Sequence, residues 1–245
     1  MDNKKLQILK IKDKGDTIFK KKPKLFDIPF KLAIIGKSQI SLGKTTIILN
    51  LLLRDDKHFY KNDFEGENIY IISNNKIDTK LKTLAKQKDV PNENMMMFDE
   101  ERIDILYDIL EDDFESGDKS RKLIIFDDVA YSGGLKGKES GVISRIVMNG
   151  RHINISSIFT SQKISLLGTN IRSQLTGALI GNVSNRELEL IEAEFNILPS
   201  KRAFFKMFRD HTKNRDFIVF NLTNGDNIYQ DKNFNNIDTS KYYKS

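Results

Sequence analysis

One segment restricts the fold more than any other part of the chain. Leu32 to Ile35 is a short apolar run, typical of a buried parallel strand, and it ends at Gly36. Gly43-Lys44-Thr45-Thr46 follows and opens a segment with helical character to about Leu53. A strand, a turn and a helix in this order place backbone N–H groups and the positive end of a helix dipole where phosphate can bind. The segment therefore predicts a phosphate-binding loop.

In this loop, Gly43 lets the backbone approach the phosphates, Lys44 reaches the β- and γ-phosphates of ATP, and the Thr45 hydroxyl ligates Mg²⁺. The pattern G-x-x-x-x-G-K-[ST] requires a first glycine where this chain has Ser38. Either Ser38 takes that place, or a longer turn begins at Gly36; an ordinary strand–turn–helix is the alternative. The full set of predicted nucleotide-binding residues is Gly36, Ser38, Ser41, Leu42, Gly43, Lys44, Thr45 and Thr46.

The rest of the chain alternates between strand and helix patterns, which predicts a mainly parallel sheet flanked by helices. We expect Ile103, Leu106, Ile109 and Leu110 to share the buried face of one helix. A C-terminal β-hairpin is expected from residues 203–209 and 216–222. Further strands are predicted at 68–73, 95–98, 123–126, 153–160 and 177–180, and further helices at 78–86, 103–114, 141–149 and 185–195.

Three regions are expected along the chain: a basic N-terminal arm at 1–30, an ATPase domain at 31–225 and a polar, loose tail at 226–245. The net charge of +6 is uneven, with +5 in residues 1–30, +4 in 196–245 and −3 between them. Basic ends suggest contact with a polyanion, although lysine-rich ends can also serve solubility alone. The chain has no cysteine, which excludes disulfides, and no apolar run approaches the ~20 residues of a membrane span.

Two carboxylates follow the most apolar strand, Leu123 to Phe126. Asp127 and Asp128 would lie at the carboxyl end of that strand, where parallel sheets bind ligands. We expect Asp127 to hold Mg²⁺ through a water molecule and Asp128 to polarise the attacking water. Without the phosphate loop, Asp127 and Asp128 would more simply be interpreted as a helix cap or a solvated strand end.

Gln162 follows the strand at 153–160 and is expected to orient the water and to sense hydrolysis; capping of the next helix is its alternative role. A ring motor also needs an arginine supplied by a neighbouring subunit. Arg151 and Arg172 are the better candidates for that role, ahead of Arg145, although most surface arginines are only solvated charges.

Together, these motifs and the stretch Asn149-Gly150-Arg151-His152-Ile153-Asn154-Ile155-Ser156 resemble those of the poxvirus-type genome-packaging ATPases. These enzymes belong to the FtsK–HerA superfamily, which includes the packaging ATPases of virophages. The resemblance covers residues 32–182. It implies a P-loop NTPase fold of the RecA-like (ASCE) type with ATP and Mg²⁺ bound. It also implies a homo-oligomeric ring, expected to be hexameric, that moves double-stranded DNA into a preformed capsid.

The same resemblance implies capsid proteins as partners and action in the virion or the cytoplasm of the infected host cell. The lack of a long apolar run predicts that no membrane is involved. Lys136 and Lys138, in a glycine-rich loop, would contact DNA phosphates at the pore, although such a loop can equally be just solvated. A nucleoside or nucleotide kinase and a RecA-like helicase or recombinase are the alternative functions. The tandem acids favour hydrolysis over a kinase, and Tyr131 is the single aromatic residue of loop 131–140, which does not favour base stacking.

Overall fold

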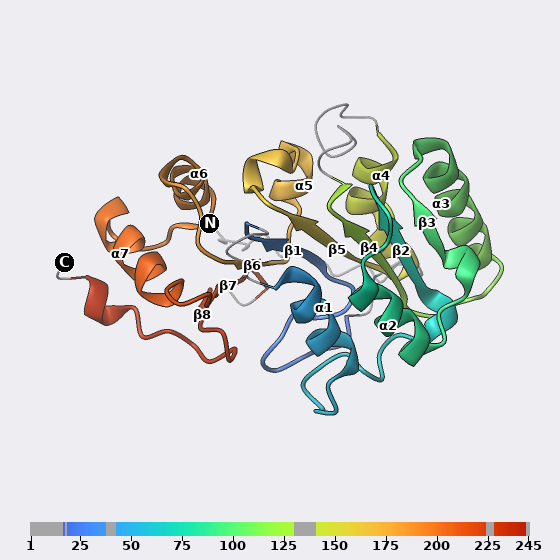
Figure 1. The fold of residues 1–245 in the computed structure, drawn as a ribbon, viewed down its shortest axis with the longest axis horizontal. Coiled ribbons are helices and arrows are strands. Elements are labelled where there is room, and N and C mark those ends of the chain that lie inside the picture. Colours follow the sequence, from blue (N-terminus) through green and yellow to red (C-terminus); the bar gives the residue numbers. More distant parts are fainter. Residues whose placement is uncertain (1–16, 18, 38–42, 130–140, 224–227, 244–245) are drawn as a thin grey trace, which may run out of the picture.

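The computed structural model describes residues 17, 19–37, 43–129, 141–223 and 228–243. The candidate residues Ser38, Ser41 and Leu42, and the loop with Lys136 and Lys138, lie outside these ranges. The described part forms one eight-stranded sheet in the order β3-β2-β4-β5-β1-β6-β7-β8, with helices on both faces (Figure 1). The α/β class expected from the sequence is therefore confirmed.

Strands β1 to β6 are parallel to one another, and β7 and β8 are antiparallel additions at one edge. One strand, β5, lies between the strand before the phosphate loop, β1, and the strand that carries the acids, β4. The strands are β1 Lys31–Ile35, β2 Ile69–Ser73, β3 Met95–Met97, β4 Lys122–Asp127, β5 Ile155–Ser161, β6 Gly177–Ile180, β7 Ile218–Asn221 and β8 Tyr229–Gln230.

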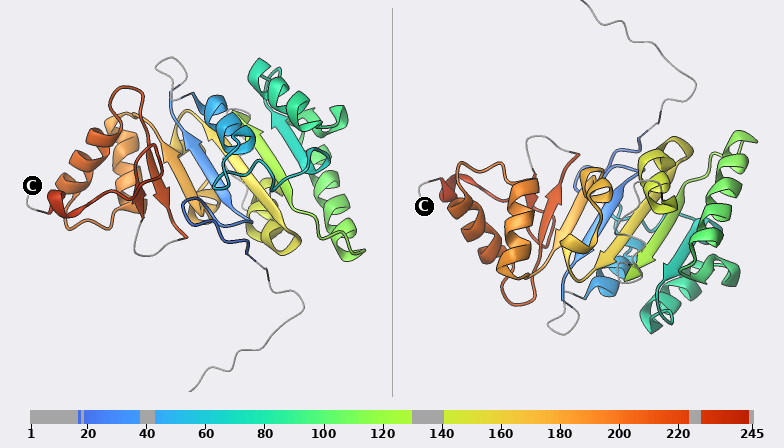
Figure 2. Two further views of the ribbon diagram at one scale, coloured as in Figure 1. Left: turned by 90° about the horizontal axis from the view of Figure 1, so that it is seen from below. Right: turned by 90° about the horizontal axis from the view of Figure 1, so that it is seen from above.

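Two apolar layers enclose the sheet because side chains alternate along each strand. Leu32 and Ile34 face the layer that contains α1 and α2, while Ala33 and Ile35 face the layer of the later helices (Figure 2). The α-helices are α1 Lys44–Leu53, α2 Thr79–Lys88, α3 Glu100–Glu115, α4 Val142–Asn149, α5 Thr169–Ser173, α6 Asn185–Phe195 and α7 Lys201–His211. Short 3₁₀ turns occupy Gly66–Asn68, Asn92–Asn94, Gly150–Ile153, Ile164–Leu166 and Ser240–Tyr242.

The predicted strand at 203–209 is wrong, because this segment is the helix α7. Ser200 caps it by accepting a hydrogen bond from the Ala203 N–H, and the buried residues Ala203, Phe204, Met207 and Phe208 recur at helical spacing. An antiparallel C-terminal pair does exist, but its strands are β7 and β8, and β7 also pairs with β6. The expected strand at 216–222 is therefore present as β7, and its antiparallel partners are β6 and β8 instead of residues 203–209.

Two smaller predictions also need correction. Ile103, Tyr107 and Leu110 form the buried face of α3, whereas Ile109 is 51% exposed, because a spacing of six residues turns it about 120° around the helix from Ile103. The strand predicted from residue 153 begins at Ile155 instead. Gly150–Ile153 forms a 3₁₀ turn that ends at Asn154 in the left-handed conformation.

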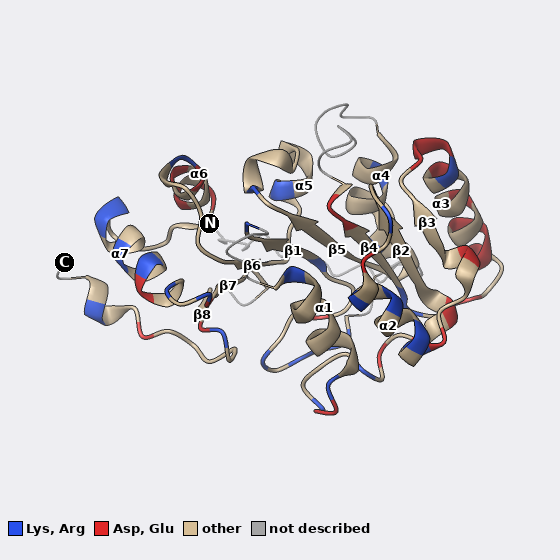
Figure 3. Ribbon diagram, viewed as in Figure 1, with Lys and Arg blue, Asp and Glu red and all other residues tan. Residues whose placement is uncertain are grey.

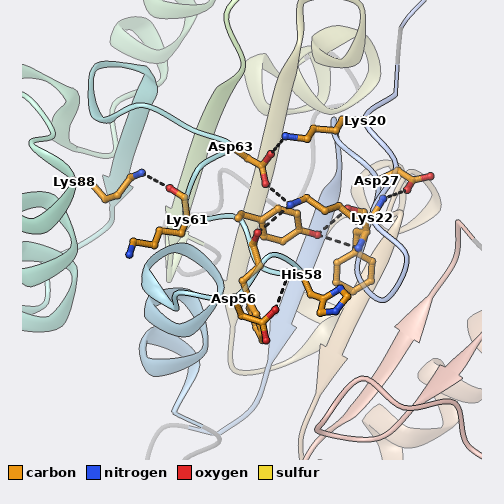
Figure 4. A network of polar contacts seen from close by, with 11 residues as sticks. Lys20, Lys22, Asp27, Asp56, His58, Lys61, Asp63 and Lys88 are labelled. Atoms are coloured by element: carbon orange, nitrogen blue, oxygen red, sulfur yellow. Dashed lines mark hydrogen bonds and ion pairs between the residues drawn. The ribbon is translucent and has the colours of Figure 1, made fainter.

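The basic segment before β1 is packed into the fold. Lys20 and Lys22 both pair with the carboxylate of Asp63, and Lys22 also donates to the carbonyl of Phe59 at 2.9 Å (Figure 4). The Tyr60 hydroxyl donates to the Phe26 carbonyl at 2.8 Å. Lys20 and Lys22 are therefore committed to holding the segment onto the loop that follows α1. The expected boundary at residue 30 cuts through this packed region.

The C-terminal segment is likewise not a loose tail throughout. Tyr229 and Gln230 form β8, the Tyr229 hydroxyl donates to the Phe195 carbonyl at 2.8 Å, and Tyr242 is buried. Strand β8 and the buried Tyr229 and Tyr242 therefore attach this segment to the fold, although its polar composition predicted a loose tail. Along the described ranges, every helix is too short or too polar to cross a bilayer.

Candidate active site

The carboxyl ends of the central strands bring the predicted phosphate loop and acidic pair to one edge of the sheet. Gly36 follows β1, and its N–H donates to the carbonyl of Ser161 at 3.0 Å. The Lys44 ammonium, from the first turn of α1, donates to the Gly36 carbonyl at 3.1 Å. The lysine thus bends back over the end of β1, which is the position from which it can reach a bound phosphate.

Gly43 directly precedes helix α1 and adopts a left-handed conformation with φ 68° and ψ 48°. Glycine reaches this conformation without the steric cost that a side chain adds. Among the described residues, no side chain caps the first turn of α1. The N–H groups of this first turn point toward the end of the helix where an anion can bind, and the helix dipole adds to the attraction.

Thr160, at the end of β5, joins the two consecutive acids of β4. Its hydroxyl donates to Asp127 Oδ1 at 2.7 Å and accepts a hydrogen bond from the Asp128 N–H at 3.0 Å. Asp128 has a φ of 54°, an uncommon backbone conformation that aspartate tolerates better than most residues. Strained backbone of this kind clusters at functional sites.

The two carboxylates differ in their surroundings. Burial raises the pKa of Asp127, and the negative charge of Asp128 raises it further. The hydrogen bond from Thr160 and the positive charge of Lys44 both lower this pKa. Asp128 Oδ1 is buried and finds no hydrogen-bond partner within the described part of the chain. A buried acceptor without a partner carries an energetic cost that a bound water or ligand can remove.

Gln162 directly follows Ser161, which is level with Ile35 in the β1–β5 pairing. Because β5 separates β1 from β4, Gln162 leaves the sheet between the Gly36 turn and the acidic pair. Its side chain is half-buried. The backbone of Gln162 therefore lies at the same sheet edge as Gly36 and the Asp127–Asp128 pair.

A cavity of about 220 Å³ opens beside Gly36. Gly36 and Lys37 form one wall, and Asn214 and Arg215, both with positive φ, form part of the other. Ligand pockets for drug-sized molecules usually reach ~300–1,000 Å³, so this cavity would hold only part of a nucleotide. Its remaining lining residues are Gly181, Asn182, Thr212, Lys213 and Asp216.

The candidate arginines lie at the opposite edge of the sheet. Arg151 precedes β5 and Arg172 precedes β6, so neither lies at the edge that carries Lys44. Arg172 is held by Glu194 at 2.6 Å and by the Leu167 carbonyl, and its side chain is 13% exposed. Arg151 is exposed, and its Nε contacts the adjacent His152 ring at 3.3 Å. Arg145 is committed to three carboxylates of α3.

Sequence reasoning missed two side chains at this edge. Thr160 is one, and its signal was a hydroxyl at the end of an otherwise apolar run, Ile158-Phe159, in the strand beside the acids. Lys80 is the other; it lies in the first turn of α2 and donates to the Thr46 hydroxyl at 2.8 Å. Nothing in the sequence places Lys80 beside α1, because that contact depends on how the two helices pack.

Comparisons with known proteins agree with this geometry. The family model described as Poxvirus A32 protein matches residues 17–235. The genome packaging NTPase B204 from Sulfolobus turreted icosahedral virus 2, solved with ATP-gammaS, has a TM-score of 0.54 and 16% identity over 80% of this chain and 93% of that chain. EssC (ATPases 2 and 3) from Geobacillus thermodenitrificans has a TM-score of 0.54 and 13% identity, covering 82% of this chain and 38% of that chain. No curated protein sequence matches.

The two structural likenesses, at these identities, support the fold, which is that of P-loop ATPases. The family match covers most of the chain, from the packed basic segment to β8 and beyond. It therefore confirms the resemblance to the poxvirus-type ATPases that the motifs predicted. The chain belongs to the Poxvirus A32 protein family.

Proposed function

We propose that the chain is an ATP-hydrolysing motor that moves double-stranded viral DNA into a preformed capsid. The observation that carries the proposal is the meeting of Lys44, Gly36 and the Asp127–Asp128 pair at one sheet edge, in a chain of this family. B204, whose fold is similar, is a DNA-packaging ATPase by its own description. The tandem acids suit hydrolysis better than transfer to a small acceptor, so a kinase is not favoured.

In this proposal, Lys44 and the first N–H groups of α1 bind the phosphates of ATP, and the cavity beside Gly36 accommodates part of the nucleoside. The donors present also fit a magnesium ion, which prefers oxygen ligands and retains several waters. Thr45 and Asp127 would hold it, and when bound it would neutralise charge on the phosphates. Within the described ranges, no three acidic, histidine or cysteine side chains are placed to hold a metal ion together. In this proposal, phosphate oxygens and water supply the remaining ligands.

For hydrolysis, Asp128 accepts the proton of the attacking water, and its unpartnered Oδ1 is the atom suited to that contact. Thr160 holds the backbone of Asp128 and the carboxylate of Asp127 in place. Gln162 orients the same water. A positive charge from Arg151 of a neighbouring subunit stabilises the transition state, and Arg172 is less suited because its guanidinium is already bonded.

The motor would work as a homo-oligomeric ring, expected to be hexameric, in the infected cell and at the capsid. DNA would be gripped through its phosphates by lysines, with Lys136 and Lys138 as candidates. Such contacts are independent of sequence and weaken steeply with salt.

The test is steady-state ATPase activity with and without long double-stranded DNA. We expect stimulation by DNA, and a fall of at least about 100-fold for both Lys44→Ala and Asp128→Asn, since each removes a group that acts on the reacting phosphate or water. Lys86→Ala, on the exposed end of α2, is the matched control and should retain full activity. Activity that ignores DNA but responds to a nucleoside would instead identify a kinase.

A further inference from the structure

The turn between α7 and β7 borders the cavity that opens beside the phosphate loop. The walls of this cavity come from three places: Gly36 and Lys37 after β1, Gly181 and Asn182 after β6, and residues 212–216 of the turn. Strand β6 lies on one side of β1, whereas β5 and then β4, with its acidic pair, lie on the other (Figure 1). The cavity is therefore on the side of the phosphate loop that faces away from the acids.

This placement gives a bound nucleotide a direction. The reacting phosphate belongs beside the acidic pair at the end of β4. Lys44 donates to the Gly36 carbonyl at 3.1 Å, and Gly36 itself lines the cavity, so the phosphate-binding lysine lies next to the cavity wall. A nucleotide whose last phosphate lies at the acids directs its nucleoside toward β6. The turn after α7 then lies beside the base and the ribose.

Arg215 has a backbone conformation that a side chain makes costly. The Asp216 N–H donates to the Lys213 carbonyl at 2.9 Å and closes a four-residue turn, whose central residues Asn214 and Arg215 have φ values of 53° and 68°. Positive φ at both central positions is characteristic of a type I′ turn, in which glycine is favoured at the second of them. Arginine adds a steric cost there that glycine would avoid. The turn itself does not need this side chain, so its role depends on what the side chain contacts.

Basic residues predominate on α7 and on the turn that follows it (Figure 3). From the start of α7 to the end of the turn there are six Lys or Arg and two Asp. Both acids are already engaged, since Asp210 pairs with Lys213 at 2.8 Å and Asp216 pairs with Lys232 at 2.9 Å. Arg215 is exposed, and among the described residues no carboxylate pairs with it. Its guanidinium can therefore contact a ligand in the cavity that it lines.

The other polar groups of the cavity suit a nucleobase better than a further phosphate. Asn182 and Asn214 each carry a carboxamide, which offers an acceptor as well as two donors. A phosphate mainly accepts hydrogen bonds, whereas the edge of a base presents donors and acceptors together. A planar guanidinium also stacks on aromatic faces, which a base has and a phosphate lacks.

We propose that Arg215 stacks on the purine base of the nucleotide and that Asn182 and Asn214 bond to the edge of that base. The α7–β7 turn then sets the nucleotide preference of the motor, and the chain prefers ATP to CTP because a purine offers the larger face for stacking. This inference rests on the proposed function, since it concerns the same nucleotide. It involves one subunit alone, so an arginine from a neighbouring subunit can still act at the reacting phosphate.

The experiment compares a nucleotide with its phosphates alone. Isothermal titration calorimetry measures how AMPPCP and inorganic tripolyphosphate, each with Mg²⁺, bind to the unaltered chain and to Arg215→Gly. Glycine is favoured at this turn position, so the variant keeps the turn and loses only the side chain. AMPPCP should bind about 3–30-fold more weakly to the variant, the range of a cation–π contact, while tripolyphosphate should bind within about twofold of the unaltered chain.

Steady-state kinetics provide a second measurement. In Arg215→Gly the KM for ATP should rise by a similar factor with kcat nearly unchanged, because the base takes no part in the reaction. The ratio of the KM for CTP to the KM for ATP should fall toward one. Arg202→Ala is the matched control, since it removes the same charge from α7 at a position outside the cavity. It should leave both KM values unchanged.

Four outcomes would contradict these assignments. If Arg215→Gly binds AMPPCP as the unaltered chain does, the inference is wrong. Equal losses for AMPPCP and tripolyphosphate would assign Arg215 to a phosphate instead. Unchanged KM values with lost stimulation by DNA would assign it to nucleic acid. An unaltered chain that binds neither probe would refute the proposed function itself, so the two failures are distinct.

Discussion

Thr160 positions both acids of the site with a single hydroxyl. It donates to Asp127 Oδ1, which favours the ionised form of that carboxyl, and it accepts from the Asp128 N–H, which holds the backbone of Asp128 in place. The pKa of Asp127 is raised by burial, and the Thr160 hydrogen bond is the largest influence that opposes this rise. A residue that does not touch the substrate thereby keeps the pKa of Asp127 lower than burial alone would make it.

Replacing Thr160 by valine keeps the shape and removes the hydroxyl. ATPase activity should fall by about 10–100-fold, the range found when a hydrogen-bond partner of a metal ligand is lost. The pKa of Asp127 should rise further, so protonation would begin at higher pH and the acid limb of the kcat/KM profile should move upward. The measurement is the pH–rate profile of the folded variant.

Thr160→Ser is the matched control, because serine retains a hydroxyl at the same position. It should recover both the rate and the position of the acid limb. If valine lowers the rate but leaves the acid limb unchanged, Thr160 acts through packing alone.

Strand β6 shows how closely the segment before β1 is fitted to the sheet. Gly177, the first residue of β6, lies against the ring of Phe26, and a Cβ atom added there would come within 2.1 Å of Phe26 Cε1. Phe26 is fully buried, and the backbone around it is held by Tyr60. The segment 20–30 is thus a structural part of the ATPase domain, and it needs a glycine opposite it.

Gly177→Ala should therefore lower the free energy of unfolding by about 1–3 kcal/mol, the usual cost of overpacking a core. Combining it with Phe26→Leu should cost less than the two single changes together, because the smaller side chain leaves room for the added methyl group. Urea unfolding of the two single variants and the double variant measures this coupling. Additive values would mean that the ring moves aside without cost.

The whole molecule places its candidate arginines at the edge of the sheet opposite its own phosphate loop. Arg151 can therefore act only on the site of a neighbouring subunit, if it acts in hydrolysis at all. Arg151→Ala should lower DNA-stimulated ATPase activity by about 10³–10⁵-fold, the range for loss of an arginine finger. Arg172→Ala should have a smaller effect, because that side chain is bonded within its own subunit.

Mixing variants tests the action between subunits directly. Arg151→Ala keeps an intact phosphate loop, and Lys44→Ala keeps an intact arginine, so a mixed oligomer contains some complete sites. Random assembly of equal amounts should restore about a quarter of the sites, if each site draws on two adjacent subunits. Mixed oligomers that form but show no recovered activity would exclude Arg151 from this role.

The motifs that lie within one strand–turn–helix were predictable, because their chemistry depends on neighbours in sequence. Gly43, Lys44 and the two acids at the end of β4 are of this kind, and parallel strands bring their carboxyl ends to one edge. The prediction of a strand at 203–209 was wrong because a short apolar run can belong to a helix or to a strand. The apolar residues from Ala203 to Phe208 fit the period of a helix and that of a strand. Packing of Phe204 against Phe220 and Tyr229 favours the helix.

The sequence by itself therefore determined the α/β class, and it placed Lys44 at the start of a helix and the acidic pair at a strand end, through local spacing and the period of apolar residues. Tertiary structure decided which side chains from distant segments meet. Thr160 bonds to Asp127 between the neighbouring strands β5 and β4, and Lys80 of α2 bonds to Thr46 of α1. Phe26 packs against Gly177, far away in the sequence. It also placed α3 and α7 at opposite ends. Such contacts depend on strand order and helix packing, which no local pattern encodes.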